Sequence, residues 1–401
     1  MAVEAEKPDT ATFGSLLGNR EFMVAIAGFA LHSVSAAAMS VALSVLVYER
    51  TGSPLLSGLA LVSSALPYLF GATFLLAYAD RMPPRRGLAG ISVAQAAVLA
   101  LLATGLLPVA AMLAVSLALG AVLPIGTAIR SALLPDLLGS HEYVLGRAVL
   151  NMTGYITQVV GFAAGGTLLA TTDAPVTLWF AGALSVAAFL TLRFGLRPRP
   201  ARGRADGAAW RQTWRVNRRL LADPAVRGLL LAHWLPLAAI AGPEAAFVPY
   251  AAQHGRPELG SVLLWSVAAG GLAGDLTVGR FVAPAWQERL ALPLALWMGL
   301  PLLLFAAGPG LPAAAVVCFL AVLGVAYQLG LQRRFLDAVP EEARGQAFGL
   351  LLTGIVTIQA LAQTVAAALA EGMPARYVIV SFGGVVLLTA LGLARRLRPA
   401  N

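Results

Sequence analysis

The chain has 401 residues, of which 59% are hydrophobic and only 12% are charged. This small number of polar side chains cannot cover the surface of a soluble domain of this length. The sequence therefore predicts an all-α protein with many membrane-spanning helices. The net charge of +9 arises from arginines in short loops without a stripe of stacking aromatic residues, which argues against a nucleic-acid partner. The single cysteine, Cys318, rules out an intrachain disulfide and a cysteine metal cluster.

A short basic loop, residues 80–86, orients the chain. It reads Asp-Arg-Met-Pro-Pro-Arg-Arg between two apolar runs, and its two prolines prevent the helix from continuing. Short arginine-rich loops stay in the cytoplasm. With this loop inside, every lysine and arginine falls on the inner side except Arg50, Arg130, Arg256 and Arg376. We therefore expect a protein of the cell inner (plasma) membrane with both termini in the cytoplasm.

Twelve apolar runs are long enough to span a bilayer, which takes about 20 residues each. Six precede a polar segment and six follow it: residues 22–47, 54–79, 88–106, 109–134, 147–170 and 175–194, then 226–251, 259–280, 290–307, 312–336, 346–370 and 377–394. The polar segment, residues 193–219, holds nine arginines and one acid. We expect an N-terminal bundle over 1–194, a cytoplasmic basic linker over 195–222 and a C-terminal bundle over 223–401.

The two parts of the sequence resemble each other weakly at a shift of about 200 residues, which places His32 on His233 and Thr153 on Thr353. Six spans return the chain to its starting side, so both bundles would share one topology and be related by an axis along the membrane normal. We therefore expect two pseudo-symmetric six-helix bundles, the architecture of transporters that rock between two states.

The whole chain resembles the major facilitator superfamily, and within it exporters of the enterobactin-exporter and macrolide-efflux kind. The superfamily's loop pattern Gly-x-Leu-Ala-Asp-Arg-x-Gly-Arg-Arg falls on residues 76–85, which keep its Ala79, Asp80, Arg81 and Arg85. Residues 47–54 and 130–136 are similar to segments that recur in the exporter subgroup, and residues 161–166 resemble an antiporter signature with Phe162 in place of proline. The resemblance implies the major facilitator fold, a monomer and transport driven by an ion gradient.

The resemblance also implies a cytoplasmic latch in the basic loop. Asp80 would accept hydrogen bonds from the amides that open the eleventh helix at Pro340, because a helix N-terminus attracts a carboxylate. Arg81 or Arg85 would pair toward Asp136. The alternative is a solvated loop that only fixes topology.

Three residues are candidates for proton coupling. Glu244 lies within an apolar run after Gly242-Pro243, where an ionised carboxylate is costly unless it lines a cavity or has a partner. A buried carboxyl group can exchange a proton near neutral pH, as coupling requires. His32 and His233 could also carry a proton, although a histidine that only packs between helices is the more common case. The alternative for Glu244 is a place near the outer mouth.

Polar and aromatic side chains on otherwise apolar helices indicate a roomy substrate cavity with a few polar contacts. These are Asn151, Gln158, Trp234, Trp265, Tyr327, Gln328 and Gln359. Arg130 could bind an anionic substrate there, or it could extend to the inner interface or pair with Asp136, which is the more common behaviour. Asp275 has no cation on its own helix face, so we expect an inner-gate pair with Arg333 or Arg334 of the tenth helix.

The remaining function classes fit the sequence less well. It contains no phosphate-binding loop, zinc-binding His-Glu-x-x-His helix or Gly-x-Ser-x-Gly elbow, so we expect no enzyme, no ATP-driven pump, no cofactor and no metal. A channel would not need the repeat, and a scaffold would not need membrane-embedded acids. We expect a proton-coupled exporter of a bulky organic compound such as a drug, natural product or siderophore, with the substrate, protons and the lipid bilayer as its partners. Solute uptake by the same fold is the alternative.

Overall fold

The computed structural model describes residues 13–71, 81–201 and 208–397, and all regular structure in these ranges is helical. Ten helical segments of the described chain are long and apolar enough to cross a membrane. They are Arg20–Thr51, Pro84–Ala103, Val109–Leu137, Ala174–Gly195, Pro224–Ala252, Pro257–Phe281, Pro284–Ala307, Leu311–Ala338, Arg344–Gly372 and Ala375–Gly392. The many long apolar helices expected from composition are thus observed in the described chain.

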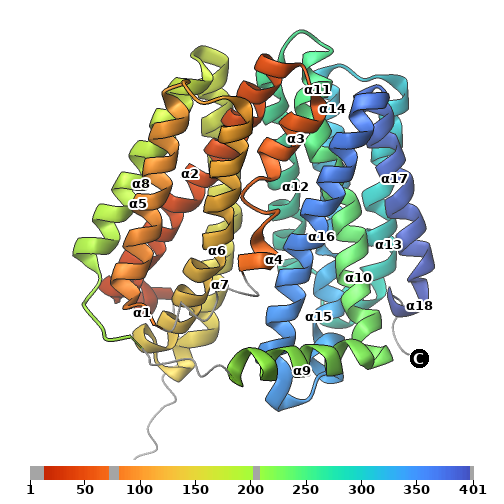
Figure 1. Ribbon diagram of the computed structural model, residues 1–401. Helices are drawn as coiled ribbons and strands as arrows, with labels where there is room; N and C mark the ends of the chain where they lie inside the picture. The colour runs from red at the N-terminus through yellow and green to blue at the C-terminus, as the bar shows by residue number, and fades with distance from the viewer. Residues whose placement is uncertain (1–12, 72–80, 202–207, 398–401) are drawn as a thin grey trace, which may run out of the picture.

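The first half of the molecule is formed by the helices before residue 196 (Figure 1). They are α1 (Phe13–Gly18), α2 (Arg20–Thr51), α3 (Pro54–Val62), α4 (Tyr68–Phe70), α5 (Pro84–Ala103), α6 (Val109–Leu137), α7 (Ser140–Thr171) and α8 (Ala174–Gly195). Helix α2 packs against α7 and α8, and α5 packs against α8 and α6. Local signals set the helix ends: Asn19 caps α2 by accepting from Phe22 N at 3.0 Å, and Gly52 ends that helix with φ 65°.

The second half follows α9 (Ala208–Ala222), a helix with four arginines that packs on α10 and α16. The second half contains α10 (Pro224–Ala241), η3 (Gly242–Ala246), α11 (Phe247–Ala252), η4 (Pro257–Leu259), α12 (Gly260–Phe281), α13 (Pro284–Gly299), η5 (Pro301–Ala307), α14 (Leu311–Val322), η6 (Leu323–Ala326), α15 (Tyr327–Ala338), η7 (Glu341–Ala343), α16 (Arg344–Gly372), α17 (Ala375–Gly392) and α18 (Ala394–Leu397). In three of its spans an α-helix passes into a 3₁₀ segment: η3 and η6 lie within their spans, and η5 ends its span. Both η3 and η5 contain a proline near their start.

Two of the twelve expected spans are not among the ten. The run at 54–79 begins as α3 and α4, and residues 72–80 lie outside the described chain. The run at 147–170 falls within α7, which is 32 residues long but carries more polar side chains than the other long helices.

The two ends of the molecule differ in charge. The end at which α2 and α16 begin, at the bottom of Figure 1, is here called the basic end because most arginines and α9 lie there. The opposite end, called the far end, holds Arg50, which donates to Leu107 O at 3.1 Å and Gly105 O at 3.0 Å. At the basic end, the Glu21 carboxylate binds Arg199 and accepts from Arg197 N at 2.9 Å. This carboxylate raises the pKa of Arg199 above its ordinary value.

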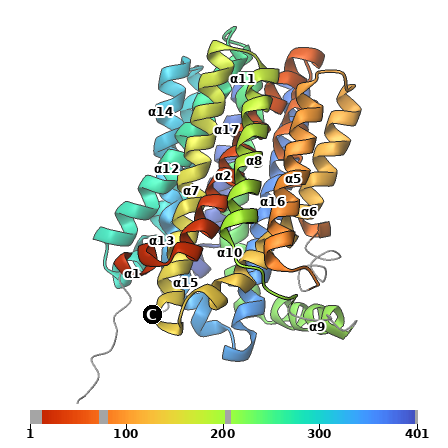
Figure 2. The ribbon, with the colours of Figure 1, turned by 90° about the vertical axis from the view of Figure 1, so that its left-hand side faces the viewer.

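The halves approach each other most closely at the far end. A Cβ on Gly166 of α7 would overlap Ser261 of α12, and a Cβ on Gly58 of α3 would overlap Ala367 of α16. From there the helices of the two halves spread apart toward the basic end, as Figure 1 shows. Figure 2 gives the view onto the first half, with α5 and α8 in front of helices of the second half. The absence of a side chain at these two glycines therefore sets how closely the far end closes.

Replacing Gly166 with alanine is expected to force the far end apart. Overpacking of a close contact costs about 1–3 kcal/mol, so the ratio of closed to open states should fall about fivefold or more. Spin labels at Leu106→Cys and Gly310→Cys, both exposed far-end positions, measure this as a longer interspin distance. Gly90→Ala is the matched control because a Cβ at Gly90 meets nothing within 4 Å. Equal distances in both variants would contradict the role of Gly166.

Candidate functional site

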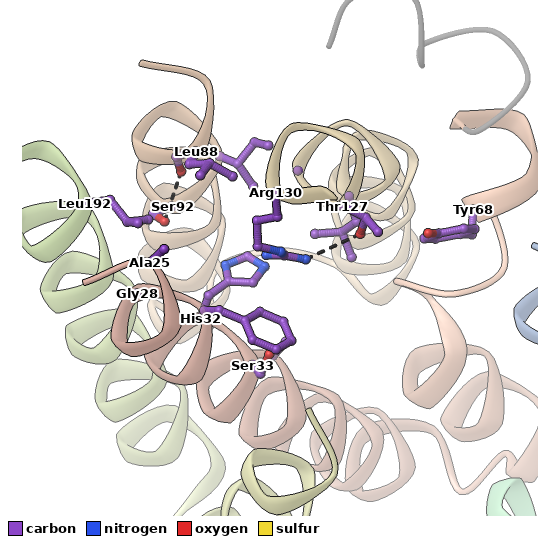
Figure 3. Close-up of a pocket in the computed structure, with 15 residues that line it drawn as sticks. Ala25, Gly28, His32, Ser33, Tyr68, Leu88, Ser92, Thr127, Arg130 and Leu192 are labelled. Carbon is purple, nitrogen blue, oxygen red and sulfur yellow. Dashed lines mark hydrogen bonds between the residues drawn. The ribbon is translucent and has the colours of Figure 1, made fainter. Parts of the chain in front are cut away.

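A cavity of roughly 210 Å³ lies inside the first half, between α2, α4, α5, α6 and α8. Figure 3 shows it from within. Its wall is mostly apolar, and its polar side chains are His32, Ser33, Tyr68, Ser92, Thr127 and Arg130. Residues 25 to 36 of α2 line it, which corresponds to a depth of roughly 16 Å along that helix at 1.5 Å per residue. The cavity therefore reaches from near the basic end to the middle of the molecule.

Close packing of the surrounding helices shapes this cavity. A Cβ on Gly28 of α2 would overlap Leu192 of α8, and a Cβ on Gly126 of α6 would lie 3.0 Å from Ile91 of α5. Both pairs of helices meet at residues that line the wall. The cavity is consequently bounded by rigid contacts between transmembrane helices rather than by loops.

Arg130 projects into the cavity from α6. Its guanidinium carbon lies 4.3 Å from the centre of the Phe29 ring, and its Nη2 donates to Thr127 Oγ1 at 3.4 Å (Figure 3). Stacking on an aromatic face holds a guanidinium in place without neutralising it. Within the described chain Arg130 has no carboxylate partner, so the pairing with Asp136 considered from the sequence is not present in this structure.

His32 lies beside Arg130 in the cavity wall, and their side chains face each other in Figure 3. Behind His32, a buried network joins three helices: Gln95 Nε2 donates to Ser35 Oγ at 3.1 Å, and Ser35 bonds to Ser185 Oγ at 2.8 Å. Gln95 is 1% exposed, and its Oε1 has no hydrogen-bond partner among the described residues. This serine and glutamine network was not anticipated from the sequence, because small hydroxyl residues in apolar helices give no distinctive pattern.

Glu244 lies in the second half, in the 3₁₀ segment η3. It is half-buried, and its Oε2 accepts a hydrogen bond from Gln363 Nε2 of α16 at 2.8 Å. The next residue, Ala245, packs at the inter-half contact, where a Cβ on Gly58 would lie 3.2 Å from the Ala245 Cβ. The acid is therefore one residue from the surface on which the far end closes.

Of three further candidates in the second half, Tyr327 and Trp234 tie helices together, and His233 bonds within its own helix. Pro236 has no N–H for the Ala232 carbonyl one turn earlier, and Tyr327 Oη donates there at 3.0 Å. His233 is buried, with Nδ1 at 2.9 Å from Leu229 O. Trp234 Nε1 donates to Leu351 O of α16 at 2.9 Å. These side chains and the cavity of the first half lie in different parts of the molecule.

The other predicted cavity residues also lie outside that cavity. Asn151 and Gln158 are exposed on α7, and Trp265 of α12 is 41% exposed. Gln328 and Gln359 are half-buried.

At the basic end, the structure describes part of the predicted latch and gate. Asp80 lies outside the described residues. Arg81 and Asp136 are exposed, and Arg85 is half-buried. Asp275 is half-buried within electrostatic range of Tyr155 on α7, and no ion pair joins it to Arg333 or Arg334 in the described chain. Arg334 instead donates to Arg396 O at 2.7 Å.

A contact missed in the sequence joins the halves at the far end. The carboxylate of Glu371, at the end of α16, accepts from the Leu55 amide at 2.9 Å and from the Ser53 hydroxyl. Both donors belong to the N-terminus of α3, where unpaired amides attract an anion. The motif Ser53-Pro54 identifies such a terminus in the sequence, but nothing in the sequence indicates which acid from the other half binds it.

The fold is shared with known transporters. Among solved structures, the chain is similar to a POT family transporter in complex with 5-aminolevulinic acid, with a TM-score of 0.72, 12% identity and 97% of each chain covered. It is also similar to a mutant form of the nucleoside transporter NupG, with a TM-score of 0.68, 15% identity and coverage of 94% and 99%. The human organic anion transporter MFSD10 (TETRAN) has a TM-score of 0.64, 18% identity and coverage of 93% and 99%.

The sequence comparisons agree with this fold. No curated protein sequence matches the chain, but the family model for the Major Facilitator Superfamily matches residues 24–331. That match covers most of the chain: nearly all of the first half, α9, and the second half as far as α15. The chain therefore belongs to the Major Facilitator Superfamily of membrane transporters.

Proposed function

We propose that this protein is a secondary active transporter that exports a bulky organic compound in exchange for protons by alternating access. The observation that carries the proposal is the asymmetry of the molecule: the halves meet at the far end, and a cavity in the first half extends from near the basic end to mid-depth. A transporter that has closed one side and receives substrate from the other has this arrangement. Structural neighbours named as peptide, nucleoside and organic anion transporters support a small organic substrate.

The proposal includes a full set of twelve spans in two six-helix bundles, over 1–194 and 223–401. The ten apolar helices become twelve when the run at 54–79 and helix α7 are added. The basic end then faces the cytoplasm of a cell with the protein in its inner membrane, since arginine-rich loops are retained there. The protein works as a monomer in this proposal, in the manner of the enterobactin-exporter and macrolide-efflux subgroup.

Glu244 is the proposed coupling residue. As a carboxylate it makes a charge-assisted hydrogen bond with Gln363. Protonation would remove that charge beside the inter-half contact at Gly58 and change the relative stability of the two states. His32 is a second candidate because it lines the cavity, while any role of His233 would have to include its bond to Leu229.

The opposite state is proposed to close at the basic end. There Asp80, Arg81, Arg85 and Asp136 would form the latch, and Asp275 would reach Arg333 or Arg334 as the inner gate. Closing that end requires the far-end contact of Glu371 with α3 to break. The two sets of contacts would then be alternatives in one two-state equilibrium.

Glu244→Gln is expected to uncouple transport from the proton gradient. A gradient of one pH unit is worth about 1.4 kcal/mol per proton, which drives up to about tenfold accumulation per proton exchanged. In proteoliposomes loaded with fluorescein or rhodamine 6G, the wild type should show gradient-driven dye movement with counterflow of protons, whereas the variant should bind dye without responding to the gradient. Glu288→Gln, on α13 near the basic end, is the matched control.

Two outcomes count against this function. Gradient-driven transport that is unchanged in Glu244→Gln would remove Glu244 from coupling. Dye movement that runs only downhill in the wild type, without proton flux, would contradict proton exchange and favour solute uptake.

Glu371→Ala is expected to favour opening at the far end. An exposed carboxylate at a helix N-terminus is worth about 0.3–1 kcal/mol, so its loss should change the ratio of closed to open states up to about fivefold. The readout is the rate at which a maleimide reagent modifies Leu56→Cys, a half-buried position on α3, and this rate should rise. The control Asp337→Asn removes an exposed charge at the basic end. A labelling rate that rises equally in both variants would show a general loosening instead.

A further inference from the structure

Among the described residues, the lining of the cavity of the first half includes a permanent cation and no acid. Its lining residues include Arg130 and His32 but neither aspartate nor glutamate. A charged side chain within a membrane protein is costly unless another group compensates it. Within the described chain, no ion pair compensates Arg130, so its positive charge is available to a ligand.

The guanidinium also has unused hydrogen-bonding capacity. It carries five N–H donors, and the structure gives it one hydrogen bond, of 3.4 Å, to Thr127. Its flat face is held by the Phe29 ring, which leaves the in-plane N–H groups free to bind a planar anion with two parallel hydrogen bonds.

The side chain is aimed at the cavity rather than at the basic end. Arg130 is seven residues before the end of α6, or roughly 10 Å. A snorkelling arginine would extend along that distance to the interface. Figure 3 instead shows the guanidinium beside the His32 ring, across the cavity from α6. The contact with Phe29 of α2 fixes this direction.

The size and lining of the cavity indicate what could bind beside the arginine. Its roughly 210 Å³ exceeds the about 150 Å³ in which an engineered apolar cavity takes up benzene. The hydroxyls of Ser33 and Tyr68 have no hydrogen-bond partner within the described residues, and the His32 ring lines the same cavity. One ring with one anionic group fits this space.

We infer that this cavity binds the anionic end of the transported compound, a carboxylate attached to an apolar ring, with Arg130 as the residue that binds the charge. This inference rests on the proposed transport function and specifies its substrate class. Phe29 and Thr127 act as positioning residues that hold the guanidinium. A compound bulkier than the cavity would leave its remainder outside the first half, in reach of the second.

Three probes of one shape test the inference at equilibrium: benzoate, benzamide and benzylamine, which are anionic, neutral and cationic. Calorimetric titration of the purified full chain in neutral detergent micelles should give saturable benzoate binding at least about tenfold tighter than that of either other probe, as a charged hydrogen-bonded pair requires. Arg130→Gln should lose this preference, and Arg130→Lys should keep part of it because the charge remains without the planar fork.

Arg193→Gln is the matched control. Arg193 also stacks on a phenylalanine, with its guanidinium carbon 5.7 Å from the Phe194 ring, but it is exposed at the end of α8. Its loss removes the same charge and should leave benzoate binding unchanged. If Arg193→Gln weakens benzoate as much as Arg130→Gln does, the binding is a general charge effect and the inference fails.

The remaining outcomes are also decisive. Equal binding of benzoate and benzamide to the wild type overturns the inference without any variant, so a poorly folded Arg130→Gln does not leave it untested. Phosphatidylglycerol added to the micelles distinguishes a lipid headgroup from a solute, because displacement of benzoate by this lipid would assign the site to a lipid phosphate. The binding measurement needs no proton gradient, so it is independent of the transport assay. If benzoate does not bind but gradient-driven dye exchange persists, the anion site is wrong and the proposed transport function stands.

Discussion

The contact between the two halves at the far end is the constraint on which the rest of the structure depends. It consists of glycines that let α3 approach α16 and α7 approach α12, and of one carboxylate, Glu371, at the N-terminus of α3. Such close contacts cannot adjust gradually, because an added side chain either fits between the helices or separates them. Two rigid halves that are held at one end must diverge at the other. The approach to the cavity from the basic end thus follows from how closely the far end packs, and a small change there moves the entire half.

Two charged side chains within the membrane spans, Arg130 and Glu244, are costly to bury and are the main candidates for function. Arg130 is held by an aromatic ring and a hydroxyl, and Glu244 by one glutamine. Among the described residues, neither forms the ion pair that would make it a purely structural residue. They lie in different halves and at different depths, the arginine toward the basic end and the acid beside the far-end contact. Substrate and proton would therefore act on separate sites that are connected through the equilibrium between the two states, and direct competition for one residue is not required.

The sequence predicts where a residue lies along a membrane helix far better than which face of that helix it occupies. Hydropathy predicted the ten described helices that are long and apolar enough to cross a membrane. The family resemblance drawn from short motifs is confirmed at the level of the superfamily. The face that a residue occupies is harder to predict, because helices that are apolar on all faces carry little amphipathic signal. His32 and His233 align in the repeat, yet one lines a cavity and the other bonds to its own helix. Tyr327 was expected in a cavity, but Pro236 leaves a carbonyl that its hydroxyl binds. Glu371 was missed because its partner lies in the other half.

Simultaneous distances at both ends test the central claim, alternating access, most directly. One spin-label pair at the basic end, on Arg86→Cys and Asp337→Cys, and one at the far end, on Leu106→Cys and Gly310→Cys, would be measured in separate samples of the full chain in lipid nanodiscs, at neutral and at acidic pH. Alternating access predicts a short and a long distance at each end. Between the two pH values, the population with the short basic-end distance should rise as the population with the short far-end distance falls. Populations that change at one end only, or in the same direction at both, would contradict it.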